Sequence, residues 1–300
     1  MTKKRLIIFL VMTFLATWGY CLAFVHPYME TSNAEELSLR IAVTMFIPAI
    51  CVLITRLITK EGFQNHMIKP NFKGNVKIYL LAYFGPSALS ILGAIVYFLI
   101  FPSQFDSNCG YLLKLYETMG VDLNTMPMPA NLLILSQGIT GILFGPILNF
   151  VTCFGEEWAW RGYMVPKMAE NMKTVPMLLL SGVIWGLWHA PLTIVGHNYG
   201  MGYWGYPVTG ILAMCFFCTV IGVFMSYITL KTKSCIPAVL AHGAINAFAS
   251  VGMFFTQDGG NPFLGPAPIG VIGMIAFIVL DIFLVSALRK DENNKKVEIA

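Results

Sequence analysis

Residues 78–101 read IYLLAYFGPSALSILGAIVYFLIF and contain no charged side chain. A helix rises about 1.5 Å per residue, so a run of about 20 apolar residues crosses the roughly 30 Å of hydrocarbon in a bilayer. Similar runs recur along the whole chain. Because lipid offers the backbone no hydrogen-bond partners and the alternating pattern of a barrel strand is absent, we expect each run to be helical.

The composition agrees with a membrane location. Of the 300 residues, 57% are hydrophobic and only 11% are charged, and the mean hydropathy is +0.70. Soluble domains carry about 25% charged residues. The sequence therefore predicts an all-α polytopic membrane protein, a bundle of about eight transmembrane helices with a polar site inside the membrane.

The expected spans lie near residues 6–25, 40–59, 78–101, 131–153, 175–195, 207–230, 236–256 and 267–288. We expect residues 1–300 to form a single membrane domain. Within it, the N-terminal spans occupy 1–130, a motif-bearing core about 131–256, and the last span with a cytoplasmic tail 257–300.

Charge separates the loops into two classes. If the N-terminus lies inside, the inner segments hold 17 of the 19 Lys and Arg residues. The acidic residues gather in the outer loops, at Glu30, Glu35, Glu36, Asp106, Glu117, Asp122 and Asp258. This pattern predicts that both termini are cytoplasmic, in the plasma membrane if the protein is bacterial. Topology also explains the net charge of +4 better than binding to nucleic acid does.

Ionisable residues inside spans are functional candidates. In FGEEWAWRGYM, residues 154–164, Glu157 and Arg161 are four apart and can form an ion pair on a helix. Glu156 is rotated by about 100° from that pair, which leaves it free to act as a general base. The alternative is an interfacial belt that only anchors the helix end.

Two further spans carry polar groups. In SGVIWGLWHAP, residues 181–191, Trp185 and His189 share a helical stripe with two glycines, which predicts that the stripe faces protein. In VLAHGAINAFAS, residues 239–250, His242 and Asn246 share a face and can donate to an oxyanion. A packed, hydrogen-bonded histidine and a clamp between helices are the structural alternatives.

Together these groups predict hydrolysis of a carbonyl compound such as a peptide bond. Glu156, His189 and His242 also form a set that zinc accepts, so a metal-activated water remains open. We assign no role to the loop histidines His26, His66 and His197. The pair Cys215 and Cys218 lies within an apolar run, where packing is expected.

Three motifs resemble those of the CPBP family, which contains the CAAX prenyl endopeptidases and the bacteriocin-processing or abortive-infection intramembrane proteases. The family's EExxxR appears as Glu156 to Arg161, its aromatic-xxx-His as Trp185 to His189, and its HxxxN as His242 to Asn246. The resemblance covers residues from about 145 to 250. Trp185 stands where the family usually has Phe.

The resemblance implies an eight-helix membrane protease that cleaves membrane-associated peptides, either CAAX-like or bacteriocin-like. Carried over, Glu156 activates water, His189 positions it or transfers protons, and His242 with Asn246 forms the oxyanion site. Glu157 and Arg161 would support the site, as would Trp185. The family includes members described as metalloproteases and others described as glutamate-dependent, and Asn246 in place of a stronger ligand favours glutamate.

Two other classes remain as alternatives. A non-catalytic bacteriocin-immunity or scaffold protein would keep the packing residues without needing Glu156, and a small transporter would use the polar cluster as a relay. By helix length, His189 and His242 lie deeper than Glu156. We therefore expect the fourth helix to end late or the fifth to begin early, near Thr174, and a water-filled cavity to open on the cytoplasmic side.

Overall fold

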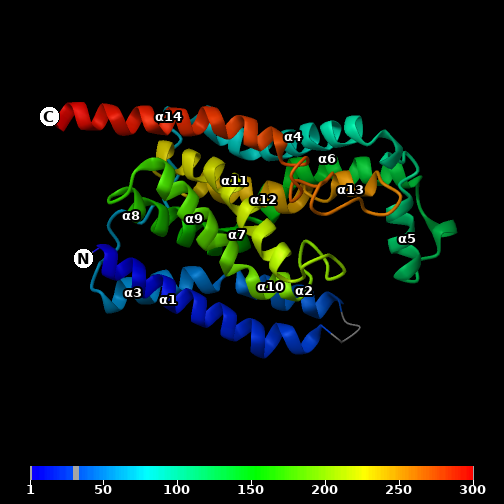
Figure 1. Cartoon of the computed structure of the whole chain (residues 1–300), viewed down its shortest axis with the longest axis horizontal. Coiled ribbons are helices and arrows are strands. Elements are labelled where there is room, and N and C mark those ends of the chain that lie inside the picture. The colour runs from blue at the N-terminus through cyan, green and yellow to red at the C-terminus, as the bar shows by residue number, and fades with distance from the viewer. Residues whose placement is uncertain (1, 30–33, 300) are drawn as a thin grey trace.

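The computed structural model describes residues 2–29 and 34–299, and every regular element within them is a helix (Figure 1). The long helices in the first half are α1 (Thr2–Tyr20), α2 (Ala34–Thr44), α3 (Ile47–Ile58), α4 (Val76–Ile100), α5 (Gly110–Thr118) and α6 (Ala130–Leu148). The second half contains α7 (Phe150–Ala159), the π-helical turn η5 (Trp160–Met164), α8 (Val165–Ala169), α9 (Thr174–Trp188), α10 (Ala190–Ile194), α11 (Val208–Thr232), α12 (Ile236–Phe248), α13 (Val251–Phe254) and α14 (Ile275–Ile299). The predicted all-α fold is confirmed.

Among the described residues, six helical segments are long and apolar enough to cross a membrane. They are Thr2–Tyr28, Glu35–Ile58, Val76–Ile100, Ala130–Leu148, Val208–Thr232 and Ile236–Phe254. Each corresponds to one of the expected spans. The chain is an integral, multi-pass membrane protein.

The other two expected spans are also helical, but they are shorter. The fifth is α9, an apolar helix of 15 residues that ends at Trp188, one residue before His189. In the eighth, residues 267–274 form turns and the helix begins only at Ile275. Its apolar portion, up to residue 288, is therefore about 21 Å long. The expectation of about eight spans thus agrees roughly with the structure.

Helices α11 and α12 form the centre of the bundle, and α11 is the most buried of the six long segments. Helix α11 packs against α9, α12 and α14, while α12 packs against α4, α6 and α7. In Figure 1, α14 and α4 run along one side of these central helices and α1 with α3 along the other.

Glycine determines how closely α9 approaches α11. A Cβ atom on Gly182 would lie 2.4 Å from the Cα of Thr219, and one on Gly186 would lie 2.4 Å from the Cα of Cys215. Only a residue without a side chain fits at either position. The predicted protein-facing stripe of α9 is confirmed, and Cys215 of α11 packs against it.

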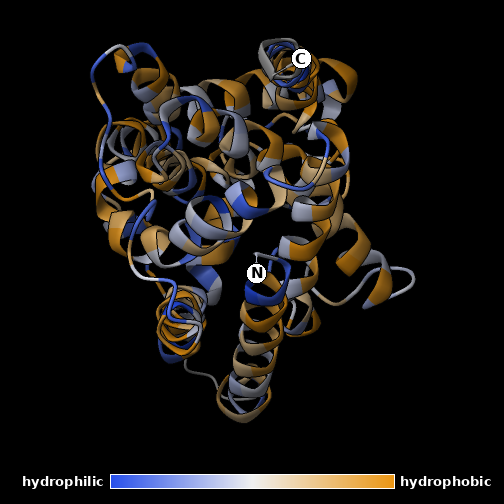
Figure 2. Cartoon of the chain, turned by 90° about the vertical axis from the view of Figure 1, so that its left-hand side faces the viewer, coloured by the Kyte–Doolittle hydropathy of each residue, from blue (hydrophilic) through white to orange (hydrophobic). Residues whose placement is uncertain are grey.

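The outer faces of the helices are apolar, as Figure 2 shows by the hydrophobic colouring along them. Leu57, Leu99, Leu148 and Leu212 are each more than 60% exposed, at 66%, 76%, 77% and 65%. Large aliphatic side chains with this exposure fit a surface that faces lipid.

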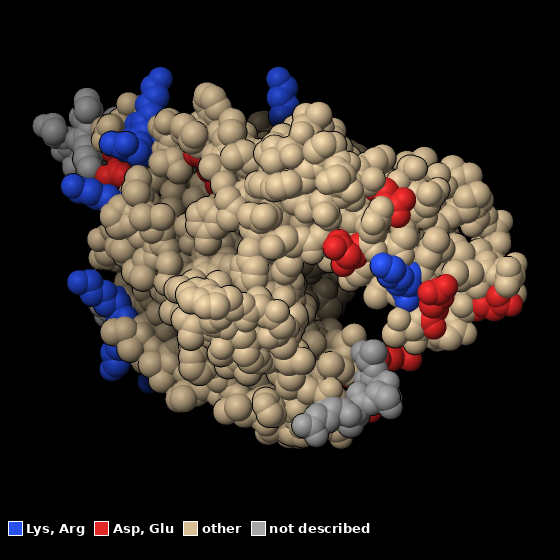
Figure 3. Space-filling view, turned by 45° about the vertical axis from the view of Figure 1, so that its right-hand side comes forward, with Lys and Arg blue, Asp and Glu red and all other residues tan. Residues whose placement is uncertain are grey.

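Charged residues gather at opposite ends of the molecule. Figure 3 shows acidic side chains at the right-hand end and most Lys and Arg side chains at the left-hand end. We name these the acidic end, which carries Asp106, Asp122 and Asp258, and the basic end, which carries the loop at 59–75 and α8. The separation follows the distribution of loop charges in the sequence.

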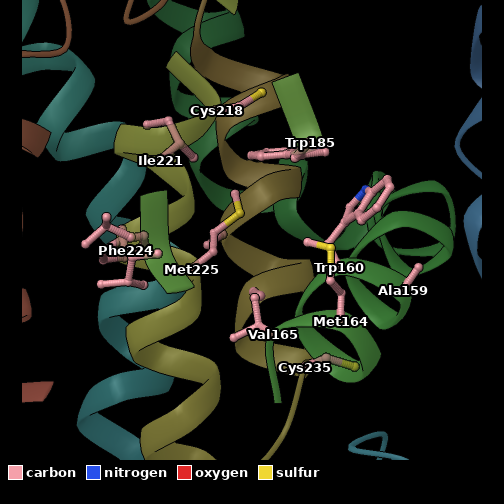
Figure 4. Packing of buried hydrophobic residues seen from close by; sticks show 14 of the residues in the cluster. Ala159, Trp160, Met164, Val165, Trp185, Cys218, Ile221, Phe224, Met225 and Cys235 are labelled. Atoms are coloured by element: carbon pink, nitrogen blue, oxygen red, sulfur yellow. The ribbon is translucent and has the colours of Figure 1, made fainter. Parts of the chain in front are cut away.

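The interior joins the motif-bearing helices in one apolar cluster. Figure 4 shows Trp160, Met164 and Val165 from the segment after α7 beside Phe224 and Met225 of α11. All five side chains are at most 1% exposed. This packing fixes η5 and α8 against the central helix, and so it fixes the segment that follows the two glutamates.

Candidate active site

The fourth span bends before it reaches the two glutamates. Helix α6 ends at Leu148, and α7 begins at Phe150 after Asn149, whose side chain donates to the carbonyl of Gly145 at 3.0 Å. Pro146 removes one backbone donor in this last turn of α6. The bend directs α7 into the protein, where it packs against α3 and α12.

Helix α7 approaches the second span closely. A Cβ atom on Gly155 would lie 2.4 Å from the carbonyl oxygen of Met45. As a result the next two residues are buried, with Glu156 2% and Glu157 0% exposed. The helical path continues through η5 and α8 to Ala169, and α9 begins at Thr174. The fourth helical path therefore ends later than the expected boundary at residue 153, and α9 begins at the expected Thr174.

The predicted ion pair forms. Arg161 Nη1 donates to Glu157 Oε1 at 2.8 Å and to Oε2 at 3.0 Å, with both side chains buried. Arg161 belongs to η5, a π-helical turn of the kind that is often found at functional sites. The pair neutralises Glu157 inside the bundle and leaves Glu156 as the carboxylate without a cationic partner among the described residues.

Trp185 links Glu156 and Arg161 to the two histidines. Its Nε1 donates to Glu156 Oε2 at 2.9 Å, and the Arg161 guanidinium lies over its ring, 4.0 Å from the centroid. The same ring makes edge contacts with His189 and His242, each with 5.6 Å between centroids. Trp185 thus contacts every other charged or titratable group of the motifs except Glu157.

His189 lies at the C-terminal end of α9 and is buried. Its Nδ1 is 2.8 Å from the carbonyl oxygen of Trp185. Because a carbonyl oxygen can only accept, Nδ1 carries the proton and the neutral ring presents a lone pair at Nε2. The ring also packs edge-on against Trp188, at 4.7 Å between centroids, which fixes its orientation.

His242 contacts the ion pair rather than Glu156. Its Nδ1 lies 2.9 Å from Glu157 Oε1, and its side chain is 8% exposed. The Glu157 carboxylate accepts hydrogen bonds from Arg161 and can only accept, so Nδ1 of His242 donates to it. Glu157, held by Arg161, therefore orients His242 through its Nδ1, on the side of the ring away from Nε2. This is the position in which we expected the two residues to support the site. A carboxylate on the far nitrogen of a functional imidazole is a common orienting device.

Asn246 is one helical turn beyond His242 and is exposed. Its Nδ2 makes a single weak contact with Cys153 Sγ at 3.6 Å. The remaining amide hydrogen and the amide oxygen have no partner among the described residues. The side chain is therefore available to a ligand.

One cavity of about 330 Å³ brings the predicted residues together. Its lining includes Glu156, Trp185, His189, His242 and Asn246. Glu157 and Arg161 do not line it. The volume falls within the range of small-molecule sites, about 300–1,000 Å³. Most of the remaining wall is apolar, with Met214, Phe217, Ile221 and Met225 of α11 on one side.

The cavity extends toward the acidic end of the bundle. Its lining includes His197, the exposed Ser250 and Ile269, which belong to segments at that end. No described residue of the loop at 59–75 or of α8 lines it. The expectation that the cavity opens on the cytoplasmic side stays a prediction.

His197 was assigned no role from the sequence, yet it lines the cavity beside Asn198. Burial lowers the pKa of this loop histidine below its ordinary value. The segment folds back because the His197 amide donates to the carbonyl of Leu192 at 3.0 Å. Its neighbours in the sequence are loop residues with no motif, so no pattern in the sequence indicated this position.

The structure also allows a test of whether these residues suit zinc. Nδ1 of both histidines is already engaged, which is typical of metal-ligating imidazoles. Among the described residues, however, no three His, Cys, Asp or Glu side chains are grouped so that they could hold a metal ion. A metal-activated water held by Glu156, His189 and His242 therefore stays a prediction.

Comparison with known proteins gives the same family as the motifs. Residues 138–248 match the family described as type II CAAX prenyl endopeptidase Rce1-like. The matched region covers less than half of the chain. All of the predicted site residues, from Glu156 to Asn246, lie within it.

A curated relative agrees with this assignment. CAAX prenyl protease 2 of Methanococcus maripaludis is 29% identical over 106 residues, which cover 34% of this chain. The matched region spans 38% of the relative's length. The similarity is therefore confined to the motif-bearing core, and the flanking spans are described by the structure alone.

Proposed function

We propose that this protein is an intramembrane endopeptidase that hydrolyses peptide bonds of membrane-associated substrates. The observation that carries the proposal is the convergence of Glu156, His189, His242 and Asn246 on one cavity inside a multi-pass helical bundle. These residues come from three separate helical segments, and a purely structural role would not require all four to face the same empty space.

Glu156 acts as the general base that activates water. Trp185 holds Oε2, while Oε1 has no hydrogen-bond partner among the described residues and belongs to a residue that lines the cavity. A water bound at Oε1 would lose a proton to the carboxylate as its oxygen attacks the peptide carbonyl. The protonated Glu156 then delivers that proton to the departing amine.

His189 positions the attacking water. With its proton on Nδ1 engaged by the carbonyl of Trp185, it presents the lone pair of Nε2, which accepts a hydrogen bond from the water. Packing against Trp188 keeps this nitrogen in place without any contribution from the substrate.

His242 and Asn246 stabilise the tetrahedral oxyanion. Asn246 donates from its amide. Nδ1 of His242 is directed at Glu157, so this ring can donate to the oxyanion only from a protonated Nε2. The Glu157 carboxylate supports that imidazolium, and Arg161 keeps the carboxylate ionised and in position.

The substrates are peptides or proteins held at the bilayer, of the CAAX-like or bacteriocin-like kind implied by the family. The two matched descriptions name CAAX prenyl proteolysis, and neither mentions bacteriocin immunity or a metal. A location in the plasma membrane, if the protein is bacterial, with both termini cytoplasmic, is part of the proposal. A non-catalytic immunity or scaffold protein is the competing class.

Glu156→Gln tests the proposal because it preserves the shape of the side chain but cannot act as a base. Wild type and the variant, purified in detergent, would be incubated with a peptide library, and cleavage would be measured by mass spectrometry. Glu117→Gln is the matched control, since Glu117 is exposed and far from the motifs in sequence. We expect the loss of general-base catalysis to lower activity by about a hundredfold to ten-thousandfold.

The same experiment separates the alternatives. Activity that survives chelation but disappears in Glu156→Gln supports glutamate-dependent hydrolysis, whereas loss on chelation would return zinc to the mechanism. Thermal melts of all three proteins check that they are folded. If wild type and Glu156→Gln cleave equally, Glu156 is not the general base. If neither cleaves while both bind the same peptides equally, the protease proposal is wrong and the scaffold interpretation replaces it.

A further inference from the structure

A second cavity lies at the basic end, outside the candidate active site. Its volume is about 250 Å³, and it is formed where the start of α1, the end of α3, η5 and α8 meet. Its charged lining residues are Arg5, Arg56, Lys167, Glu61 and Glu170. None of these residues belongs to the three motifs, and none lines the first cavity.

Arg56 is the unusual member of this group. The residue is only 3% exposed, yet no described carboxylate forms an ion pair with it. Its Nη1 donates to the backbone carbonyls of Gly62 and Gln64 at 2.7 and 3.4 Å, and its Nε has no hydrogen-bond partner. A buried guanidinium without a compensating anion is costly.

The carboxylates of the cavity are already engaged by other groups. Glu61 accepts a hydrogen bond from Lys167 and one of 2.9 Å from Tyr163, and its Oε2 lies 3.7 Å from Arg5 Nε. Nε of Arg5 itself forms no hydrogen bond. Glu170 accepts from the Thr2 hydroxyl at 3.0 Å. Three cations therefore face two carboxylates, and two guanidinium nitrogens lack acceptors.

The surroundings of the cavity indicate where an anion would come from. Ile7, Leu57 and Ile58, which lie within two residues of Arg5 or Arg56, are 61%, 66% and 59% exposed. Such faces are lipid-contacting in a membrane protein. Basic pockets between transmembrane helices suit the head groups of anionic lipids. A ligand here would place its phosphate among the cations and its acyl chains along α1 and α3.

We propose that this cavity binds the phosphate of an anionic phospholipid, with Arg5, Arg56 and Lys167 as its ligands. Arg is well suited to phosphate because its planar donors match the oxygens in pairs. The inference does not depend on the proposed protease activity, because no residue of the catalytic set takes part. A bound phosphate would also stabilise η5, because Gly162 and Tyr163, the two residues after Arg161, line the cavity.

The test uses the full chain purified in detergent. Phosphatidylglycerol, phosphatidylcholine and inorganic phosphate would each be titrated, with binding followed by native mass spectrometry and by the melting temperature. The variants are Arg5→Gln and Lys167→Gln, with Lys114→Gln as a control that removes a cation from the acidic end. Arg56→Gln is added, but its burial makes unfolding a separate outcome that the melt in phosphatidylcholine detects.

We expect wild type and Lys114→Gln to bind phosphatidylglycerol in preference to phosphatidylcholine. Each of Arg5→Gln and Lys167→Gln should weaken that binding by about tenfold, the factor for one charge-assisted hydrogen bond. Equal stabilisation by inorganic phosphate would support the phosphate site and assign it to a soluble anion. Equal binding of both lipids, or phosphatidylglycerol binding unchanged in both variants, would overturn the proposal.

Discussion

The indole Nε1 of Trp185 donates a 2.9 Å hydrogen bond to Oε2 of Glu156, joining α9 to α7 inside the bundle. The family resemblance leads to the expectation of Phe at this position, which has no such donor. In this chain Trp185, the aromatic residue of the second motif, therefore orients the carboxylate of Glu156 in the first motif. The same ring lies beneath the Arg161 guanidinium, so that one side chain connects the base to its supporting ion pair.

Trp185→Phe should lower proteolytic activity by about tenfold, the effect of one lost hydrogen bond to a charged group. The fold should survive, because Phe is the family's usual residue and fills most of the same volume. Cleavage rates and melting curves would be compared with those of Trp204→Phe, which changes an indole that is 90% exposed. Unchanged activity in Trp185→Phe would show that the indole nitrogen does not orient Glu156.

The ion pair behind His242 predicts a different result for Glu157→Gln. This change leaves Arg161 buried with an uncompensated charge, and we expect a loss of about 3–5 kcal/mol of unfolding free energy together with loss of activity. In the double variant Glu157→Gln/Arg161→Gln, stability should recover in part, since no buried charge remains, while activity should not. The measurement is a double-mutant cycle by denaturant unfolding. If the changes in unfolding free energy of the two single variants add up to that of the double variant, Glu157 and Arg161 do not interact as a buried ion pair.

The close contact of α9 with α11 can be tested at Gly186. Adding one methyl group in Gly186→Ala places a Cβ atom 2.4 Å from the Cα of Cys215, so the helices must separate. We expect a destabilisation of about 1–3 kcal/mol and a displaced His189, hence lower activity. Gly202→Ala is the control, because nothing lies within 4 Å of its added Cβ. Equal melting temperatures for the two variants would contradict the tight packing.

Local rules in the sequence were sufficient for much of the site. The ion pair between Glu157 and Arg161 follows from helical spacing, and the start of α9 follows from Thr174 ahead of Pro176. The inward face of α9 follows from its glycines. Each of these features depends on residues within a few positions of one another, where the geometry of one helix decides the outcome.

Features that depend on tertiary packing could not be predicted in the same way. The hydrogen bond from Trp185 to Glu156 joins residues 29 positions apart, and its existence depends on how α7 bends after Asn149. The position of His197 at the cavity depends on the fold-back of a loop onto Leu192. The extent of the cavity depends in the same way on residues from four separate segments, α7, α9, α11 and α12, which lie far apart in the sequence.

The pH dependence of stability should report on Glu61 in the loop after α3. Burial raises the pKa of this carboxyl, but hydrogen bonds from Lys167 and Tyr163 outweigh burial, and the pKa lies below its ordinary value. Because the folded pKa is the lower one, the stabilisation is complete above the unfolded pKa of about 4.3 and is lost as the pH falls through the folded pKa.

Melting temperatures of wild type and Glu61→Gln should therefore differ most near neutral pH, approach each other as the pH falls below about 4.3, and converge only below the folded pKa. Glu117→Gln serves as the control, because Glu117 is exposed, and its melting curve should run parallel to that of wild type. If the difference in melting temperature between wild type and Glu61→Gln stays constant down to acid pH, the charge of the Glu61 carboxylate does not stabilise the fold.

The extension of the cavity toward the acidic end, where Ser250 lines it, predicts a labelling pattern. All seven native cysteines are buried, so the wild type should react little with a membrane-impermeant maleimide. Ser250 is exposed and lines the cavity, and Asp122 and Lys60 are exposed near the acidic and basic ends. In sealed vesicles of known orientation, Ser250→Cys should be labelled from the same side as Asp122→Cys and opposite to Lys60→Cys. By the distribution of loop charge, the labelled side of Ser250→Cys should be the outer one. Labelling of Ser250→Cys together with Lys60→Cys would mean that water reaches Glu156 from the basic end, and the route proposed for the attacking water would have to be reversed.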